Sequence, residues 1–293
     1  MSSSTAILSS SPDTTKDGSN RAPTVDVESQ QPAIEPFAIP WWAPFPPMVI
    51  LVLLLVAISY FFLDRDAAPY YNEYVAFGSG IFFICWYFYI GIERTYYYGV
   101  AGYYEIYWFC NVSLLLTGVG LAIRLPTLVC AAVCVVMLPH TAFWIDLICY
   151  ACFRITPCGA ATFLFEEGWP IHDKISTLHH FLLIPIVTFL FFRYPYVEPT
   201  AIVLAVLLLI CSQVTCHYLT PREMIDKNGK RKYLNVCISH DMPDLLVNVY
   251  PFKWIKGRPA YVLFIICFFC YAIPISVICY YLFHGLQCLL NMF

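Results

Sequence analysis

The stretch TLVCAAVCVVMLPHTAFWIDLICY, residues 127–150, contains one carboxylate, Asp146, and neither lysine nor arginine. A helix needs about 20 mostly apolar residues to cross the hydrocarbon core of a bilayer. This stretch has that length, and Pro139 is expected to kink the helix that it forms. It therefore predicts a membrane-spanning helix near the middle of the chain.

The composition of the whole chain extends this interpretation. The 293 residues are 60% hydrophobic and 12% charged, whereas soluble domains are about 45–50% apolar and about 25% charged. A net charge of -3 offers no electrostatic basis for binding nucleic acid. We expect an all-α, polytopic transmembrane bundle over residues 41–293, with about seven spans near residues 47–63, 74–92, 104–123, 127–150, 175–192, 200–218 and 260–283.

The distribution of basic residues predicts the orientation of this bundle, because cytosolic loops carry the excess of lysine and arginine. Seven spans place the N-terminal tail and the loops after the second, fourth and sixth spans on one side. The other side then holds only Arg65, Arg124 and Arg193 of the 16 basic residues. We therefore expect a cytosolic N-terminus and a C-terminus on the opposite side of the membrane.

The segments outside the spans have compositions of their own. Residues 1–40 are rich in Ser, Thr, Pro and Gln and predict a disordered cytosolic tail. Residues 219–259 predict a basic cytosolic loop, in which Asn228-Gly229 favours a tight hairpin turn. Residues 241–250 predict either a short helix on the membrane surface or a solvated loop. In the first case the segment 227–258 would contact anionic headgroups.

Two further features have simple structural interpretations. Most of the 14 cysteines lie inside apolar runs, Cys110 among them. A thiol there behaves as a small hydrophobic group, so we expect these cysteines to pack between helices or against lipid. The apolar stretch 159–165 is too short to span and predicts a re-entrant turn, a helix extension or a buried loop.

Polar side chains inside a span are costly and mark functional sites. Most histidines fall at or near the expected cytosolic face, whereas His140 lies near the middle of the fourth span and His284 at the outer end of the seventh. Asn111 or Thr162 would donate a hydrogen bond to an oxyanion. The candidate catalytic residues are His179, His180, Asp146, His217, Asn111 and Thr162.

The chemistry of these candidates leaves two roles open. His179 or His180 would be a general base or a metal ligand, Asp146 would orient a histidine, and His217 would be a second base or ligand. Adjacent helical residues do not share a face, so we expect His179 and His180 not to grip one ion together. A divalent metal would instead take His179, His217 and Asp146 as ligands from different helices. The alternative role is hydrogen bonding that ties the helices together.

Two resemblances follow from these residues. The stretch 107–221 resembles an uncharacterised family of multi-pass membrane proteins through Cys110-Asn111, Trp144-x-Asp146, Gly159-x-x-Thr162-x-x-Phe165, Ser176-x-x-His179 and Pro185. That resemblance brings no biochemical function. His179-His180 and the later His240-Asp241-x-x-Asp244 resemble, more weakly, the TLC domain of ceramide synthases and their relatives. This second resemblance implies acyl transfer, although here His180 and His240 are separated by a whole span and a basic loop.

Two hypotheses about function result. In the first, the protein is a membrane-embedded enzyme that acts on a lipid or other amphiphile at a cytosol-facing His/Asp site. In the second, it is a non-enzymatic transporter or a structural or assembly protein, whose polar cluster ties helices together or lines a pathway. Both make it an integral, multi-pass membrane protein with membrane lipids as partners.

Overall fold

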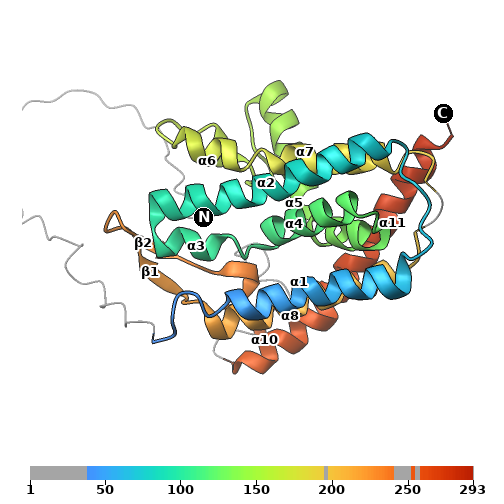
Figure 1. Cartoon of the computed structure of the whole chain (residues 1–293). Coiled ribbons are helices and arrows are strands. Elements are labelled where there is room, and N and C mark those ends of the chain that lie inside the picture. Colours follow the sequence, from blue (N-terminus) through green and yellow to red (C-terminus); the bar gives the residue numbers. More distant parts are fainter. Residues whose placement is uncertain (1–37, 195–196, 241–251, 255–257, 293) are drawn as a thin grey trace, which may run out of the picture. The chain divides into compact units, whose positions relative to one another are not determined.

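The structure is a computed structural model that describes residues 38–194, 197–240, 252–254 and 258–292. These residues form helices and one small hairpin (Figure 1). The elements, including short 3₁₀ or π-helical turns (η), are α1 (Phe45–Ile58), η2 (Ser59–Leu63), α2 (Glu73–Tyr98), α3 (Val100–Glu105), α4 (Phe109–Ala122), α5 (Pro126–Phe153), η3 (Thr162–Leu164), α6 (Ile171–Ser176), α7 (His179–Leu190), α8 (Thr200–Leu219), β1 (Glu223–Ile225), β2 (Arg231–Tyr233), η4 (Val236–Ile238), η5 (Phe252–Trp254), α10 (Ala260–Cys267), η6 (Phe268–Ala272) and α11 (Ile273–Leu290).

Of the five helical segments long enough to cross a membrane, the most buried is α5, which contains residues 127–150. Every residue from Pro126 to Met137 is buried, and α5 contacts α4, α7, α8 and α11. Small side chains such as Cys130, Ala131 and Cys134 let these neighbours approach closely. Figure 1 shows α4 and α5 between α2 and α1. The first half of α5 is therefore the centre around which the other helices pack.

Two glycines allow α2 and α4 to touch through their backbones. A Cβ atom added to Gly80 would lie 2.7 Å from the carbonyl oxygen of Gly118 and 2.7 Å from the amide nitrogen of Ala122. A Cβ atom at Gly118 would lie 2.9 Å from the carbonyl oxygen of Gly80. These distances exclude any side chain. The close crossing fixes the position of α4, whose first turn carries Cys110 and Asn111.

Each of the seven expected stretches contains a helix, and five helical segments are long and apolar enough to cross a membrane: 45–63, 73–98, 126–153, 200–219 and 260–290. The expected third and fifth spans differ from prediction, because each is interrupted. The apolar parts that remain are α4, with 14 residues, and α7, with 12. At about 1.5 Å per residue these extend about 21 Å and about 18 Å, short of a core about 30 Å thick.

The interruption between α6 and α7 has a local cause. The hydroxyl of Ser176 donates to the carbonyl oxygen of Asp173 at 3.0 Å. The hydroxyl of Thr177 donates to the same oxygen at 3.2 Å and to that of Lys174 at 3.0 Å. Serine and threonine that bond backward in this way compete with the helical ladder. The chain turns at Thr177, and a new helix begins at His179.

The hairpin predicted around Asn228-Gly229 is confirmed. Strands β1 and β2 are antiparallel, with Glu223 opposite Tyr233 and Ile225 opposite Arg231. Gly229 has φ +78°, the left-handed conformation that glycine adopts readily. This hairpin covers the end of α2, since the side-chain amide of Asn228 donates to the carbonyl oxygen of Tyr97 at 3.2 Å.

Three predictions concern segments outside the expected spans: the tail, the surface helix and the short apolar stretch 159–165. The predicted tail, residues 1–40, and the predicted surface helix, residues 241–250, lie outside the described residues apart from residues 38–40. The stretch 159–165 contains the short turn η3, and Ala161 within it is buried. Of the three alternatives for this stretch, the structure favours a loop that packs against the bundle.

The glycine contact between α2 and α4 predicts a sharp difference between two neighbouring positions. Gly80→Leu is expected to lower the free energy of unfolding by about 1–3 kcal/mol, because the side chain would have to push the two backbones apart. Thermal unfolding of the purified protein in detergent, followed by tryptophan fluorescence, measures the effect.

The matched control lies one half-turn away on the same helix. A Cβ atom at Gly78 has nothing within 4 Å, so Gly78→Leu should leave the unfolding temperature unchanged or raise it slightly through better helix propensity. If both variants lose the same amount of stability, the close approach of α2 and α4 is not the reason that glycine is needed at position 80.

Candidate functional site

Three histidines form a cluster between α5 and α7. The ring centroids of His179 and His180 are 4.1 Å apart, and that of His140 is 4.7 Å from His180 and 6.1 Å from His179. Only 1% of His140 and 3% of His179 is exposed, whereas His180 is half-buried. The cluster is thus enclosed on one side and reaches the surface of the bundle on the other.

Most ring nitrogens at the buried end of this cluster have no hydrogen-bond partner among the described residues. Both nitrogens of His140 and Nε2 of His179 are in this state. A buried polar group without a partner costs about 1–3 kcal/mol, so such groups are rare in folded proteins and call for a functional explanation. The one bond made here is between Nδ1 of His179 and the carbonyl oxygen of Ser176, at 2.9 Å.

That bond determines the tautomer of His179. The carbonyl oxygen of Ser176 can only accept, so Nδ1 carries the proton and donates it. The opposite nitrogen, Nε2, then holds a free lone pair and faces an interior without a donor. A lone pair placed in this way suits a general base or a metal ligand.

The first turn of α4 adds two polar side chains. Sγ of Cys110 lies near both α7 histidines, and one ligand atom from each of Cys110, His179 and His180 falls within 4.8 Å of the others. The amide nitrogen of Asn111 donates to the carbonyl oxygen of Glu105 at 2.8 Å, while its carbonyl oxygen is buried without a partner. The expectation that His179 and His180 would not grip one ion together stays a prediction, although their ring centroids are only 4.1 Å apart.

A charged network lies at the end of α2 beside this cluster. Arg94 lies 2.5 Å from Asp173 and 2.7 Å from the hydroxyl of Ser176. It also lies 3.3 Å from Glu93 and 3.6 Å from Glu105. Because α2, α3 and α6 each contribute a residue, the network joins these three elements around one guanidinium.

Ser176 connects the network to the histidine cluster. Its hydroxyl accepts from Arg94, and its carbonyl oxygen accepts from His179 at 2.9 Å and from the indole nitrogen of Trp86 at 3.3 Å. Arg94 thereby holds the residue that orients His179. The candidate site consists of His140, His179, His180 and Cys110, with Arg94, Asp173 and Ser176 as its support.

Asp146 lies outside the histidine cluster, and its contacts hold a loop in place. It is fully buried, and its two carboxylate oxygens accept the backbone N–H groups of Cys158 at 2.7 Å and of Ala161 at 2.9 Å. The sequence analysis expected this carboxylate to orient a histidine. Instead, it fixes the loop that follows α5, because buried backbone N–H groups need acceptors in the absence of water.

Two other predicted residues also lie outside the cluster. His217 belongs to a second group, with Nδ1 2.6 Å from the carbonyl oxygen of Ser239 and its ring centroid 5.3 Å from that of His240. The hydroxyl of Thr162 lies 3.0 Å from that of Thr156, in the loop after α5. Among the described residues, the structure therefore joins His179 and His180 but places neither His217 nor Thr162 with them.

Sequence reasoning noted His140 only as an exception in depth and took Cys110 as a space-filling residue. A signal was available for His140, because it is an ionisable residue near the middle of a long apolar stretch, residues 126–153. None was available for Cys110, whose proximity to α7 depends on the crossing of α2 and α4.

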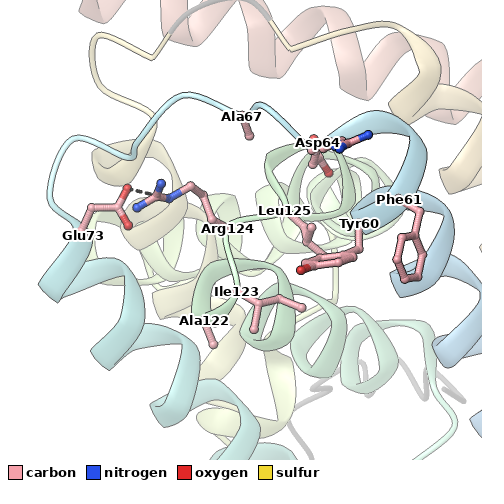
Figure 2. A pocket seen from close by; sticks show the side chains of 10 residues that line it. Tyr60, Phe61, Asp64, Ala67, Glu73, Ala122, Ile123, Arg124 and Leu125 are labelled. Carbon is pink, nitrogen blue, oxygen red and sulfur yellow. Dashed lines mark ion pairs between the residues drawn. The ribbon is translucent and has the colours of Figure 1, made fainter.

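A hollow of about 720 Å³ lies at the other end of α2. Figure 2 shows Arg124 and Glu73 pointing toward one another across it, 3.2 Å apart, with Tyr60 and Leu125 nearby. Burial raises the pKa of Asp64 above its usual range, although Thr127 donates to it through both its backbone N–H and its hydroxyl. Arg124 is paired with Glu73, and Oδ1 of Asp64 accepts from Thr127, whereas Oδ2 of Asp64 is buried without a partner among the described residues. We place the candidate site at the histidine cluster, where three such atoms come from two neighbouring histidines.

The chain was compared with models of known protein families, with curated proteins and with solved structures, and none of them matches it.

The role of Asp146 leads to a testable expectation. Asp146→Asn replaces one acceptor by a donor that would face a backbone N–H group, so the loop after α5 should loosen by about 1–3 kcal/mol. Trypsin should then cleave after the exposed Arg154 about tenfold faster or more. Limited proteolysis of the purified protein measures this rate. Asp66→Asn, at an exposed carboxylate, should leave the rate unchanged, and equal cleavage of both variants would contradict the assigned role.

Proposed function

We propose that this chain is a multi-pass membrane enzyme that acts on a lipid or another amphiphile at the histidine cluster. The observation that carries the proposal is the set of buried ring nitrogens without partners: both of His140 and Nε2 of His179. Histidines that tied helices together would use these nitrogens in hydrogen bonds, whereas here the nitrogens remain free to bind an ion or take a proton. The catalytic residues would be His179 as general base and His140 as a second proton acceptor or donor.

The surroundings support an amphiphilic substrate. His180 and Cys110 are half-buried, so the cluster is reachable from the side of the bundle, where lipid would lie. A cavity of about 700 Å³ at the end of α2 is lined by Tyr97, His172, Asp173 and Lys230, among others. Asp173 also binds Arg94, which supports the histidine cluster. An amphiphile could place its polar headgroup in this cavity and lay its apolar chain along the side of the bundle, next to the histidine cluster.

The reaction class follows from the groups present. His179 would take a proton from a water molecule or a hydroxyl group through Nε2, while Nδ1–H remains bonded to the carbonyl oxygen of Ser176. The imidazolium formed would keep that bond, and it would return its proton to the leaving group. These two proton transfers are the ones needed for hydrolysis of, or group transfer from, an ester or amide of an amphiphile. The resemblance to the TLC domain enters only through His179-His180, because His240 lies beside His217.

The alternative function, a non-enzymatic transporter or a structural or assembly protein, draws support from a different observation. Arg94 is paired on several sides and ties α2, α3 and α6 together. Such an ion-pair network suits a structural role. The histidine cluster does not share this property, and for that reason we favour the enzyme.

The membrane arrangement is part of the proposal. We propose seven spans, with α4 and α7 as two short ones lengthened by the segments that precede them, and a cytosolic N-terminus. Epitope tags at the two ends of the chain should then lie on opposite sides of sealed membrane vesicles, and protease should remove only one of them. Removal or protection of both tags together would overturn the odd number of spans.

The enzyme proposal is tested by variants of the cluster in a cell that lacks the protein. Untargeted lipid analysis should show a lipid class that changes when the wild-type chain is expressed. His179→Gln and His140→Gln should each slow that change by about 10²–10⁴-fold, the usual contribution of a general acid or base. His284→Gln, outside the cluster, is the matched control and should behave as the wild type.

Folding of each variant is checked by its expression level and by its unfolding temperature in detergent. The enzyme proposal fails if His179→Gln and His140→Gln both fold and both retain the full lipid change. It also fails if the wild-type chain alters no lipid class in any of several host cells.

A further inference from the structure

We infer that Cys110, His179 and His180 bind a zinc ion in the apolar interior of the bundle. The inference rests on the proposed function and deepens it by giving the same cluster a metal. Nε2 of His179 would then hold the ion instead of taking the proton itself, and Cys110 would be a ligand and not a space-filling residue. The inference also rests on the geometry of three side chains, on an orphaned buried nitrogen and on the bonds that hold the site from outside.

The three side chains come from two helices that approach one another. One ligand atom each from Cys110, His179 and His180 lies within 4.8 Å of the other two. Around a tetrahedral zinc ion, with Zn–N about 2.0–2.1 Å and Zn–S about 2.3 Å, neighbouring ligand atoms lie about 3.5 Å apart. Side-chain rotations that move the ligand atoms by about 1 Å would therefore bring them to coordination distance without moving either helix.

An unpartnered nitrogen points to a ligand in this place. Nε2 of His179 is buried and has no hydrogen-bond partner in the described part of the chain. Its other ring nitrogen donates to the carbonyl oxygen of Ser176. Metal-binding histidines almost always donate their second N–H to a carbonyl or carboxylate, which fixes the tautomer and the ring plane. Arg94 in turn holds the hydroxyl of Ser176 at 2.7 Å, so the support reaches a second layer.

His140 has a different place in this site. Its ring lies 4.7 Å from that of His180, and both of its nitrogens lack partners. With the ion bound, His140 would keep its role as proton acceptor or donor, now toward a water molecule at the fourth coordination position. Three protein ligands and one open position are typical of catalytic zinc sites, where the metal makes bound water a nucleophile near neutral pH. On metal binding the thiol of Cys110 would release its proton to water.

The donor set favours zinc over other common ions. A thiolate and two imidazoles are borderline to soft ligands, which suit zinc, whereas magnesium and calcium prefer oxygen. A second cluster, Glu93, His172 and Asp173, has ligand atoms that are equally close. There, however, both carboxylates lie beside Arg94, at 3.3 and 2.5 Å, and a cation would be repelled by the guanidinium.

The ligand set differs from the one that the sequence suggested. Of His179, His217 and Asp146, only His179 remains. Asp146 uses both oxygens on backbone N–H groups, and Nδ1 of His217 lies 2.6 Å from the carbonyl oxygen of Ser239 in the second histidine group.

The test uses the full chain purified in detergent, stripped with a chelator and titrated with Co²⁺ as a spectroscopic substitute for zinc. A thiolate ligand should give a sulfur-to-cobalt charge-transfer band in the near ultraviolet, together with the visible absorption of a tetrahedral ion. Added Zn²⁺ should remove both. Metal analysis of the zinc-loaded protein should give about one ion per chain.

Cys110→Ser should remove the charge-transfer band, and His179→Gln should weaken metal binding at least about tenfold. Cys211→Ser, at a half-buried cysteine outside the site, is the matched control and should retain the band. The inference is overturned if the wild-type chain binds less than about a tenth of an ion, a result that does not depend on whether any variant folds. It is equally overturned if folded Cys110→Ser keeps the band.

The two proposals separate cleanly in these experiments. If the chain binds zinc through Cys110 but changes no lipid class, the metal site is supported and the enzyme proposal is refuted. If the chain changes a lipid class in a way that depends on His179 but binds neither Co²⁺ nor Zn²⁺, the enzyme proposal is supported and the metal site is refuted.

Discussion

The ion pair between Arg94 and Asp173 is the interaction on which the arrangement of the site depends. Arg94 lies near the end of a long apolar helix, where an unpaired guanidinium would be very costly. Its pairing with Asp173 draws α6 against α2, and its bond to the hydroxyl of Ser176 fixes the turn before α7. Because His179 begins the next helix, the position of its ring follows from a charge that had to be neutralised nearby.

Asp146 and Arg94 differ from the histidine cluster in how much of their hydrogen-bonding capacity is used, and this difference supports the functional proposal. Asp146 and Arg94 find partners for most of their hydrogen-bonding capacity, and these partners join helices or hold a loop. Most nitrogens of His140 and His179 find none. A polar group that serves packing loses nothing by being satisfied, whereas a group that must bind a proton or an ion has to remain open.

The sequence anticipated the helical architecture well and the site only in part. Long apolar runs predicted a helix in each of seven places, and five of these are long enough to span. The hairpin at Asn228-Gly229 was also predictable, because its turn depends on local backbone conformation. His179 and His180 were found as candidates, since an ionisable pair beside an apolar run is unusual. His217 and Asp146 were grouped with them by depth alone, and depth does not say which way a side chain points.

What the sequence by itself determined is therefore the one-dimensional part of the structure: which stretches are apolar, where helices begin and where glycine is needed in a turn. These features depend on the residue and its near neighbours. Only the tertiary structure decided that Cys110 meets His179, that Asp146 binds its own loop, and that two adjacent histidines approach one another. Those contacts depend on the angle and rotation of whole helices. The close crossing of α2 with α4 places Cys110, and the ion pair between Arg94 and Asp173 places the start of α7; both act between residues far apart in the sequence.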